Sequence, residues 1–340
     1  MNKILELFDE QFVLDFLRRE ALSFYPEWSE ITAAKIRPYK KMIWTTTYHV
    51  VLEFQTTFKA ADGRTAVIPV ICSAHSDEPR ELVLNSLRYL EAHNFNTTNL
   101  TVPRPLFYSP HFRAAFYQGL QGENLFYYIK NNDFNEVEKM VRLAAQLFAR
   151  LHAVPLEAGE SFNVLNSRIK TVVPGVEFIY REMAGRYDKR YDADLQKIYN
   201  YFITTEEKFL ATSGGKTLIH GDAHPENIIK TGEGQIGLID FTDLCIGDPA
   251  RDIGTFWQQL EYKVGVKANN YQEAVRLAEI FKEGYASVSQ RPITPDFQER
   301  IDLYYNWTML RTAIFLFLKH DCQPARGEEL LNTIKLRLGF

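Results

Sequence analysis

Carboxylate and carboxamide side chains are concentrated between His220 and Asp252, in the segment HGDAHPENIIKTGEGQIGLIDFTDLCIGDPARD. The segment contains Asp222, then Asn227, and then a second carboxylate, Asp240. Between Asn227 and Asp240 lie two apolar runs rich in isoleucine, separated by the small and polar residues Thr231-Gly232-Glu233-Gly234. This pattern is typical of a β-hairpin. It predicts that Asn227 and Asp240 stand at the two open ends of that hairpin.

A hairpin with its turn near Gly232 and Glu233 places Asn227 and Asp240 roughly opposite each other. Opposed residues of antiparallel strands are about 4.5–5.5 Å apart at Cα. Two side-chain oxygens at that spacing can bind one ion, and Mg²⁺ takes oxygen ligands at about 2.0–2.1 Å. Asp222 has no place in that pair. A carboxylate beside a magnesium–nucleotide site can take or orient the proton of an attacking hydroxyl group.

The order HGDxHxxN, apolar hairpin, IDF and GDPxxD resembles the signature of the aminoglycoside phosphotransferase and choline kinase family, which are small-molecule kinases with a protein-kinase-like fold. The resemblance implies that Asp222 is the catalytic residue and that Asn227 and Asp240 are magnesium ligands. It also implies that Asp252 is a buried anchor that holds the catalytic loop from below. The positions that match as they stand are His220, Gly221, Asp222, His224, Asn227, Ile239, Asp240, Gly247, Asp248, Pro249 and Asp252.

The remaining motif residues are interpreted as support for the site. His220 is either a packed histidine that supports the loop or a metal ligand, and the first role is favoured. His224 supports the loop or contacts the acceptor or the phosphate. Asp248 caps a helix that begins with Pro249. Main-chain groups near Gln118 and Gly119, at the junction between two predicted lobes, are expected to bind the adenine ring of the nucleotide.

Composition and charge limit the class of protein. The chain has 340 residues and a net charge of −4, from 39 basic and 43 acidic residues. This balance gives no general attraction to nucleic acid or to an anionic membrane, so neither is an expected partner. The three cysteines match no zinc spacing. The amphipathic N-terminus does not resemble a signal peptide, and no apolar run approaches the roughly 18 residues of a membrane helix. We therefore expect a cytoplasmic protein.

The first 118 residues predict a small lobe built on an antiparallel sheet. A helix is expected at residues 9–23, and Pro103 and Pro105 are expected to mark a loop. Asp62-Gly63 is a hairpin turn signal. The expected strands cover residues 31–40, 48–58, 65–73 and 113–118, with a helix at 78–93 before the last strand.

Residues 119–340 predict a larger, mainly helical lobe. Apolar residues between Val137 and Leu151 recur with helical periodicity, with a start signal at Asp133 and a stop signal at Pro155. The stretch 156–215 is expected to be helical and to contribute to acceptor specificity. Further helices are expected at 270–288, 297–319 and 326–338. With the first lobe, this gives an α+β fold with two lobes of the protein-kinase type.

Two features of the nucleotide site depart from the kinase pattern. The third strand, AVIPVICSA, lacks the lysine that normally contacts the phosphates. The loop MIWTT between the first two strands contains no glycine, although glycine lets backbone amides approach the phosphates closely. The candidates to contact the phosphates in its place are Lys35, Lys40, Lys41 and Lys59.

We therefore expect an ATP-dependent phosphotransferase that uses Mg²⁺, with ATP or another nucleoside triphosphate as donor and a hydroxyl group of a small molecule as acceptor. The departures leave open a catalytically weak or inactive kinase-like binding protein. A third hypothesis is a metal-dependent hydrolase that uses His220, Asp222 and His224 as ligands. The aromatic residues Trp257, Tyr262, Tyr304, Tyr305 and Trp307 either form core or line a pocket for a cationic acceptor, and core is favoured.

Overall fold

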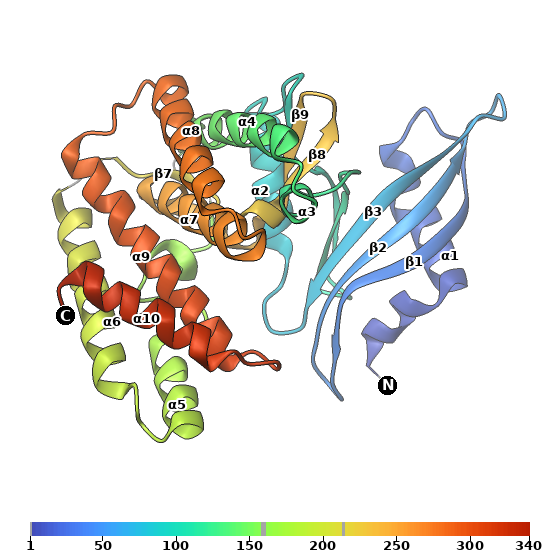
Figure 1. Cartoon of the computed structure of the whole chain (residues 1–340). Helices are drawn as coiled ribbons and strands as arrows, with labels where there is room; N and C mark the ends of the chain where they lie inside the picture. Colours follow the sequence, from blue (N-terminus) through green and yellow to red (C-terminus); the bar gives the residue numbers. More distant parts are fainter. Residues whose placement is uncertain (1, 158–160, 213–214) are drawn as a thin grey trace. The chain divides into compact units, whose positions relative to one another are not determined.

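The structure, a computed structural model, describes residues 2–157, 161–212 and 215–340. The chain forms a sheet-rich unit and a mainly helical unit (Figure 1). The first unit consists of Met1–Glu123 and Ile229–Thr242, and the second consists of Asn124–Ile228 and Asp243–Phe340. The α+β class predicted from the sequence is confirmed.

The hairpin predicted around Gly232 belongs to the first unit. Its position after Gln118 in the sequence predicts instead that it belongs to the second lobe. Backbone pairing explains the difference. Strand β9 runs parallel to β4, with Leu100 opposite Ile236. The amide N–H of Lys230 also donates to the carbonyl oxygen of Glu123 over 2.9 Å. The boundary itself falls after Glu123, a few residues beyond Gln118.

The first unit contains a five-stranded antiparallel sheet in the order β1-β2-β3-β6-β5 and a three-stranded sheet in the order β4-β9-β8. Its helices are α1 (Glu10–Glu20) and α2 (Glu81–Ala92). The strands are β1 (Glu30–Ile43), β2 (Tyr48–Lys59), β3 (Thr65–His75), β4 (Leu100–Thr101), β5 (Arg104–Ser109), β6 (Ala114–Gln118), β8 (Ile228–Gly232) and β9 (Gln235–Leu238).

The two faces of the five-stranded sheet differ in chemistry. On one face, Phe54, Val70 and Phe116 are fully buried and form one hydrophobic cluster with Phe16 and Leu17 of α1. Because successive side chains of a strand alternate between faces, the polar residues one position away lie on the opposite face. Those residues include His49, Glu53, Ser73 and His75, and His49 pairs directly with His75 between β2 and β3.

The prediction that Pro103 and Pro105 mark a loop is wrong for Pro105, which lies within β5. A proline cannot donate a ladder hydrogen bond and is tolerated in an edge strand. Strand β5 is the last strand of its sheet and pairs only with β6, with a register irregularity between Pro105 and Phe107.

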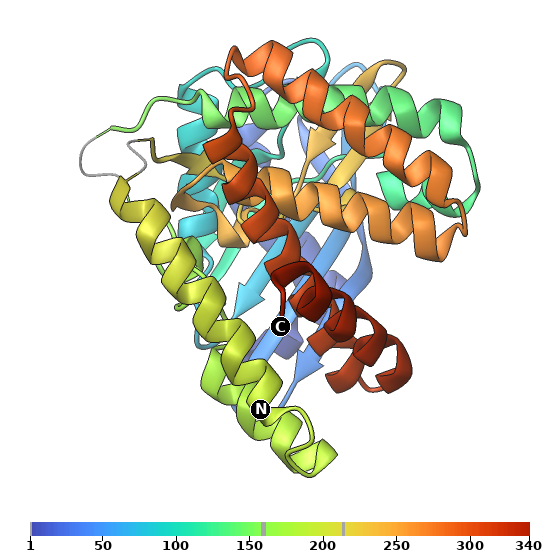
Figure 2. The same ribbon diagram turned by 60° about the vertical axis from the view of Figure 1, so that its left-hand side comes forward.

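Helices α4 and α8 lie side by side in the second unit (Figures 1 and 2), and α7 contacts α9. Asp133 accepts a hydrogen bond from the Glu136 N–H at the start of α4, as its start signal predicts. Residues 158–160 and 213–214, within the stretch expected to be helical, lie outside the described residues. The helices are α3 (Leu125–Lys130), α4 (Phe134–His152), α5 (Val176–Tyr187), α6 (Asp192–Thr212), α7 (Ala250–Glu261), α8 (Tyr271–Ser289), α9 (Pro295–Leu318) and α10 (Pro324–Leu338).

A short two-stranded sheet brings the two halves of the sequence motif together. Strand β7 (Thr217–Ile219) pairs antiparallel with β10 (Cys245–Gly247), so the loop that begins at His220 and the helix that begins at Ala250 leave the same small sheet. None of the helices within the described ranges combines the length and hydrophobicity that a membrane span requires.

Candidate active site

The loop that carries Asp222 is anchored by a buried carboxylate. Asp252, in the first turn of α7, is fully buried. Its two oxygens accept hydrogen bonds from the main-chain N–H groups of His220 (2.7 Å) and Gly221 (2.9 Å). One of these oxygens also lies 3.1 Å from Nε2 of His152, whose other ring nitrogen lies 2.8 Å from the Tyr285 hydroxyl. This arrangement matches the anchoring role that the family resemblance implies for Asp252.

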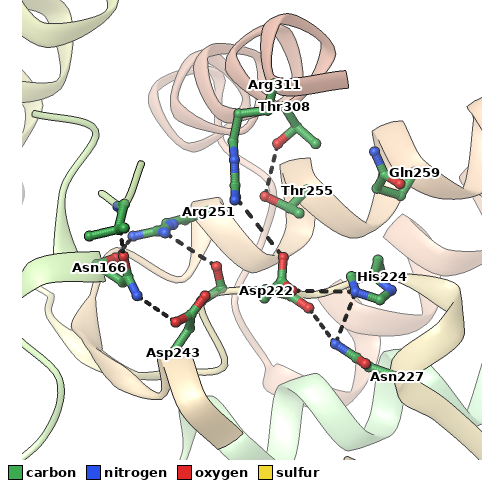
Figure 3. Close-up of polar contacts among 12 residues, drawn as sticks. Asn166, Asp222, His224, Asn227, Asp243, Arg251, Thr255, Gln259, Thr308 and Arg311 are labelled. Atoms are coloured by element: carbon green, nitrogen blue, oxygen red, sulfur yellow. Dashed lines mark hydrogen bonds and ion pairs between the residues drawn. The ribbon is translucent and has the colours of Figure 1, made fainter. Parts of the chain in front are cut away.

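Arg251, beside Asp252, holds the loop from a second direction. Its guanidinium group donates to the carbonyl oxygens of Gly221 (3.2 Å) and Asn166 and lies over the ring of Trp307. The side chain of Asn166 in turn donates to the carboxylate of Asp243 (Figure 3). Arg251 is only 1% exposed. The main-chain groups of the loop are hydrogen-bonded, and so are the side chains that flank it. The loop is therefore preorganised before any ligand binds.

Gly221 is required by the shape of this loop. Its φ is +81°, a conformation that L side chains rarely adopt, and a Cβ atom there would collide with the carbonyl oxygen of Asp243. A glycine therefore permits the turn that presents Asp222.

Asp222 lies beside His224 and Arg311 (Figure 3) and is the first member of a chain of alternating charges. Nε2 of His224 lies 3.3 Å from Oδ2 of Asp222, and Nδ1 of His224 lies 2.9 Å from Oε2 of Glu226. Nζ of Lys263 lies 2.5 Å from the other oxygen of Glu226. On the opposite side of Asp222, the guanidinium group of Arg311 lies 4.0 Å away.

These contacts set the protonation states. Burial raises the pKa of Asp222, but the hydrogen bond and charge of His224, with the charge of Arg311, outweigh burial and hold that pKa well below its usual range. Burial lowers the pKa of His224, whereas hydrogen bonding to Asp222 and Glu226 raises it, with a net value of about 9. The pKa of Glu226 falls to about 2, because His224 and Lys263 outweigh burial. At neutral pH the two carboxylates are therefore ionised and His224 is protonated.

Asn227 offers one side-chain oxygen. Its Nδ2 donates to the main-chain oxygen of Asp222 over 2.9 Å, so the amide orientation leaves Oδ1 as the oxygen available to an ion. Asp240, in the other unit, has a φ of 63°, and its Oδ1 accepts from the main-chain N–H and the hydroxyl of Thr242. An amide oxygen and a carboxylate oxygen are the hard ligands that Mg²⁺ prefers, so the donor set fits this ion.

A cavity of about 540 Å³ in the second unit has Asp222 in its wall. Hydroxyl and amide groups from α7 and α9 line it next to the charged chain: Thr255 lies 3.0 Å from Thr308, and Gln259 donates to Thr312 over 2.9 Å. We call this space the Asp222 cavity. Its lining consists of Phe126, Asp222, His224, Glu226, Thr255, Gln259, Tyr262, Lys263, Lys267, Thr308, Arg311, Thr312, Phe315, Leu316 and Lys319.

A second cavity, of about 410 Å³, lies within the first unit and includes Gln118 and Gly119, the predicted adenine-binding residues. The Gly119 N–H donates to the Pro69 carbonyl over 2.9 Å. Val67, Ile68 and Leu120 contribute apolar surface to its lining, and polar side chains such as Asn99 and Gln121 contribute hydrogen-bonding groups. A flat heterocycle with hydrogen-bonding edges suits such a site.

A basic group in the first unit, formed by Lys40, His49 and Arg80, occupies the polar side of the sheet. Nε2 of His49 lies 3.4 Å from Nζ of Lys40 and 3.5 Å from the Arg80 guanidinium group. Burial and these two cations lower the pKa of His49 to about 4, so His49 is neutral. The charge of Asp240 also acts on His49, which places Asp240 within electrostatic range of the group.

Lys40 was one of four lysines proposed from the sequence, whereas Arg80 was missed. Arg80 directly precedes α2 and its side chain is 7% exposed. It pairs with Glu78 over 3.2 Å, and its Nε has no hydrogen-bond partner among the described residues. In the sequence, Arg80 is one arginine near the start of a predicted helix, and nothing in that local pattern indicates that its side chain is buried beside His49.

The other predicted site residues take the following positions. His220 is fully buried. Asp248 accepts from the Ala250 N–H over 3.0 Å and pairs with Arg300 over 3.1 Å, so α7 begins one residue later than predicted. Burial raises the pKa of Asp248. Among the described residues, no group of three His, Cys, Asp or Glu side chains is arranged to hold a metal ion. The zinc-type centre of His220, Asp222 and His224 is therefore not formed.

Comparisons with known proteins identify the family and the fold. The phosphotransferase enzyme family matches residues 52–290, more than half of the chain. No curated protein matches the sequence. Solved structures with a similar fold include a spectinomycin phosphotransferase in complex with ADP and spectinomycin, with 13% identity, a TM-score of 0.55, and coverage of 96% of this chain and 94% of that one.

Two further structures are similar over most of their length. An ethanolamine kinase from Plasmodium vivax shares 14% identity at a TM-score of 0.54, over 90% of this chain and 82% of that one. An APH(2")-IIa ternary complex with streptomycin and ATP shares 14% identity at a TM-score of 0.55, over 95% and 97%. The fold predicted from the sequence motif is confirmed. The chain belongs to the phosphotransferase enzyme family.

Proposed function

We propose that the protein transfers the γ-phosphoryl group of ATP to a hydroxyl group of a small molecule, with Asp222 as the catalytic residue. The observation that carries this proposal is the ionised carboxylate of Asp222 in the wall of a cavity of about 540 Å³, large enough for a small metabolite. The fixed loop supports it, because phosphoryl transfer depends on positioning more than on covalent catalysis.

In the proposed reaction, the acceptor hydroxyl oxygen forms a bond to the γ-phosphorus, and the bond from that phosphorus to the β–γ bridging oxygen breaks, so that ADP leaves. The hydroxyl proton passes to the carboxylate of Asp222 and then to solvent. A carboxylate with a lowered pKa is a weak base, so Asp222 chiefly orients the hydroxyl and accepts its proton late, as the bond to phosphorus forms.

Asn227 and Asp240 are proposed to hold Mg²⁺, which neutralises charge on the phosphates when it is bound. Their positions in the chain support this role. Asn227 immediately precedes β8 and Asp240 follows β9 by two residues, and each retains an oxygen for the ion. Gln118 and Gly119 are proposed to bind the adenine ring in the cavity of the first unit.

The basic group of Lys40, His49 and Arg80 is proposed to bind the nucleotide phosphates in place of the third-strand lysine. Arginine binds phosphate oxygens with a planar pair of donors, and Arg80 keeps an unpartnered Nε among the described residues. These cations favour an active enzyme over the catalytically inactive alternative, since they supply the positive charge that the sequence pattern lacks.

The test is an ATP-consumption screen with purified protein, Mg²⁺ and a range of hydroxyl-bearing metabolites and antibiotics. With the best acceptor, Asp222→Asn should reduce transfer by about 10²- to 10⁴-fold and leave nucleotide binding unchanged. Asp321→Asn, an identical exchange at an exposed position, is the control. Retention of transfer in Asp222→Asn would contradict the proposal.

A further inference from the structure

The Asp222 cavity carries an excess of positive charge. Lys263, Lys267, Arg311 and Lys319 line it. The carboxylates in the lining are Asp222 and Glu226. Four lysine and arginine side chains thus face two carboxylates, which leaves two positive charges in excess.

The two carboxylates are already paired. Asp222 lies between His224 and Arg311, and Glu226 lies between His224 and Lys263. Lys267 and Lys319, by contrast, have no carboxylate within ion-pair distance in the part of the chain that the structure describes. Each lies near an aromatic ring of the same wall, Lys267 at 5.7 Å from the centroid of Tyr262 and Lys319 at 5.9 Å from that of Phe315.

The fold keeps these cations close together. Lys263 and Lys267 lie in a π-helical segment, Tyr262–Lys267, that continues α7, and π-helical segments frequently occur at functional sites. Arg311 lies within α9, and Lys319 directly follows it. Burial lowers the pKa of Lys267, and so do the charges of Arg326, Lys319 and Lys263, which shows that like charges crowd this end of the cavity.

We infer that the acceptor carries an anionic group, a carboxylate or a phosphate, in addition to the hydroxyl that receives the phosphoryl group, and that Lys267 and Lys319 bind this anionic group. Crowded cations without counter-ions destabilise the free protein, and a bound anion relieves that repulsion. Arg311 and Lys319 are eight positions apart, about 12 Å along a helix axis at 1.5 Å per residue. This spacing allows one ligand to place its hydroxyl at Asp222 and its anionic group at Lys319.

The inference rests on the proposed function and restricts the acceptor to molecules that carry an anionic group. A polycationic acceptor, such as an aminoglycoside, would add to the repulsion among Lys267, Lys319 and Arg311. Another use of the lysines is to bind the nucleotide phosphates. If the lysines bind the acceptor, their removal changes the KM for the acceptor. If they bind the nucleotide phosphates, their removal changes the KM for ATP, so steady-state kinetics distinguishes the two uses.

The first experiment compares four sets of acceptors of similar size in the ATP-consumption assay: hydroxy acids, alcohol phosphates, uncharged alcohols and amino alcohols, with aminoglycosides in the last set. We expect turnover with an anionic set, and the first two sets distinguish carboxylate from phosphate. Turnover that is highest with an uncharged or cationic acceptor would overturn the inference. If turnover of that acceptor still required Asp222, the proposed function would stand although the inference of an anionic acceptor would not.

The second experiment uses the double variant Lys267→Gln/Lys319→Gln, with Lys208→Gln on the exposed surface of α6 as the control. With the best anionic acceptor, the double variant should raise the acceptor KM by about 10- to 100-fold, while the KM for ATP and kcat stay within about twofold. If the KM for ATP rises and the KM for the acceptor does not, the lysines bind the nucleotide and the inference is overturned.

Binding provides a readout that does not need catalysis. With the nucleotide site filled by Mg²⁺ and excess ADP, inorganic phosphate and succinate serve as probes of the lysines. Either probe should raise the Tm of the unmodified protein and of Lys208→Gln, and should have little effect on the double variant. If neither probe shifts the Tm of the unmodified protein at millimolar concentration, or if both shift that of the double variant equally, the inference is wrong.

Discussion

Nε2 of His224 lies 3.3 Å from Oδ2 of Asp222, so the carboxylate that we propose acts on the acceptor is paired with a protonated imidazole. This pairing determines how basic Asp222 is. His224 also connects Asp222 to Glu226, and the protonation states of these three groups therefore depend on one another.

Replacement of His224 should make Asp222 more basic. In His224→Gln the hydrogen bond and charge that lower the Asp222 pKa are lost, so this pKa rises. We expect the acidic limb of the kcat/KM profile to move to higher pH by about one unit or more. His320→Gln, at an exposed position, should leave the profile unchanged. An unaltered acidic limb in His224→Gln would show that His224 does not tune Asp222.

The same histidine should make stability depend on pH in the alkaline range. The pKa of His224 rises from 6.5 to about 9 on folding. Between these values the folded state binds more protons than the unfolded state, so the free energy of unfolding falls as pH rises through that interval. We expect a decrease of about 2 kcal/mol, measured by urea denaturation at pH 6 and pH 9.5, and a flatter dependence in His224→Gln. An equal slope in both proteins would contradict this account.

Asp252 should be essential for the stability of the second unit. Its carboxylate is fully buried and binds two main-chain N–H groups and His152. Asp252→Ala leaves these donors buried without a partner, and we expect a loss of about 3–5 kcal/mol in the free energy of unfolding. Chemical denaturation measures it. Asp321→Ala, at an exposed position, should change stability by less than about 0.5 kcal/mol.

Arg80 should contribute to the binding of the nucleotide phosphates. Arg80→Gln removes a buried guanidinium group from the basic group with Lys40 and His49. We expect the Kd for Mg²⁺–ATP to rise by about tenfold or more, and the Kd for adenosine to change little, because adenosine carries no phosphate. Titration calorimetry measures both. Arg88→Gln, on the exposed side of α2, is the control. Equal losses of affinity for ATP and for adenosine in Arg80→Gln would exclude a phosphate-specific role.

Asp240 should determine the magnesium requirement. Asp240→Asn keeps the side-chain volume and an oxygen for Thr242, but it removes the negative charge. We expect the Mg²⁺ concentration for half-maximal ATP binding to rise by about tenfold or more, measured by nucleotide binding across a magnesium titration. Asp62→Asn, an equivalent exchange in the exposed turn between β2 and β3, should leave the titration unchanged.

The sequence identified the residues that lie close together along the chain. His220 to Asn227 form one loop, and the segment between Asn227 and Asp240 contains the paired strands β8 and β9 that its turn residues predict. Helix boundaries such as Asp133 also follow from local capping chemistry. The fold class and the family could be predicted for this reason, since the motif residues and the elements that carry them are local features.

Only the tertiary structure decided which residues far apart in the sequence lie together within each unit. Arg251, Arg311, Lys267 and Lys319 come from helices whose packing is not encoded in any short motif, and Arg80 reaches His49 through the pairing of β2 and β3 and the start of α2. Pro105 also lies in a strand because the edge of a sheet needs no donor there. The charge of a cavity depends on which side chains converge across long sequence separations. The proposal of an anionic acceptor therefore required the folded chain.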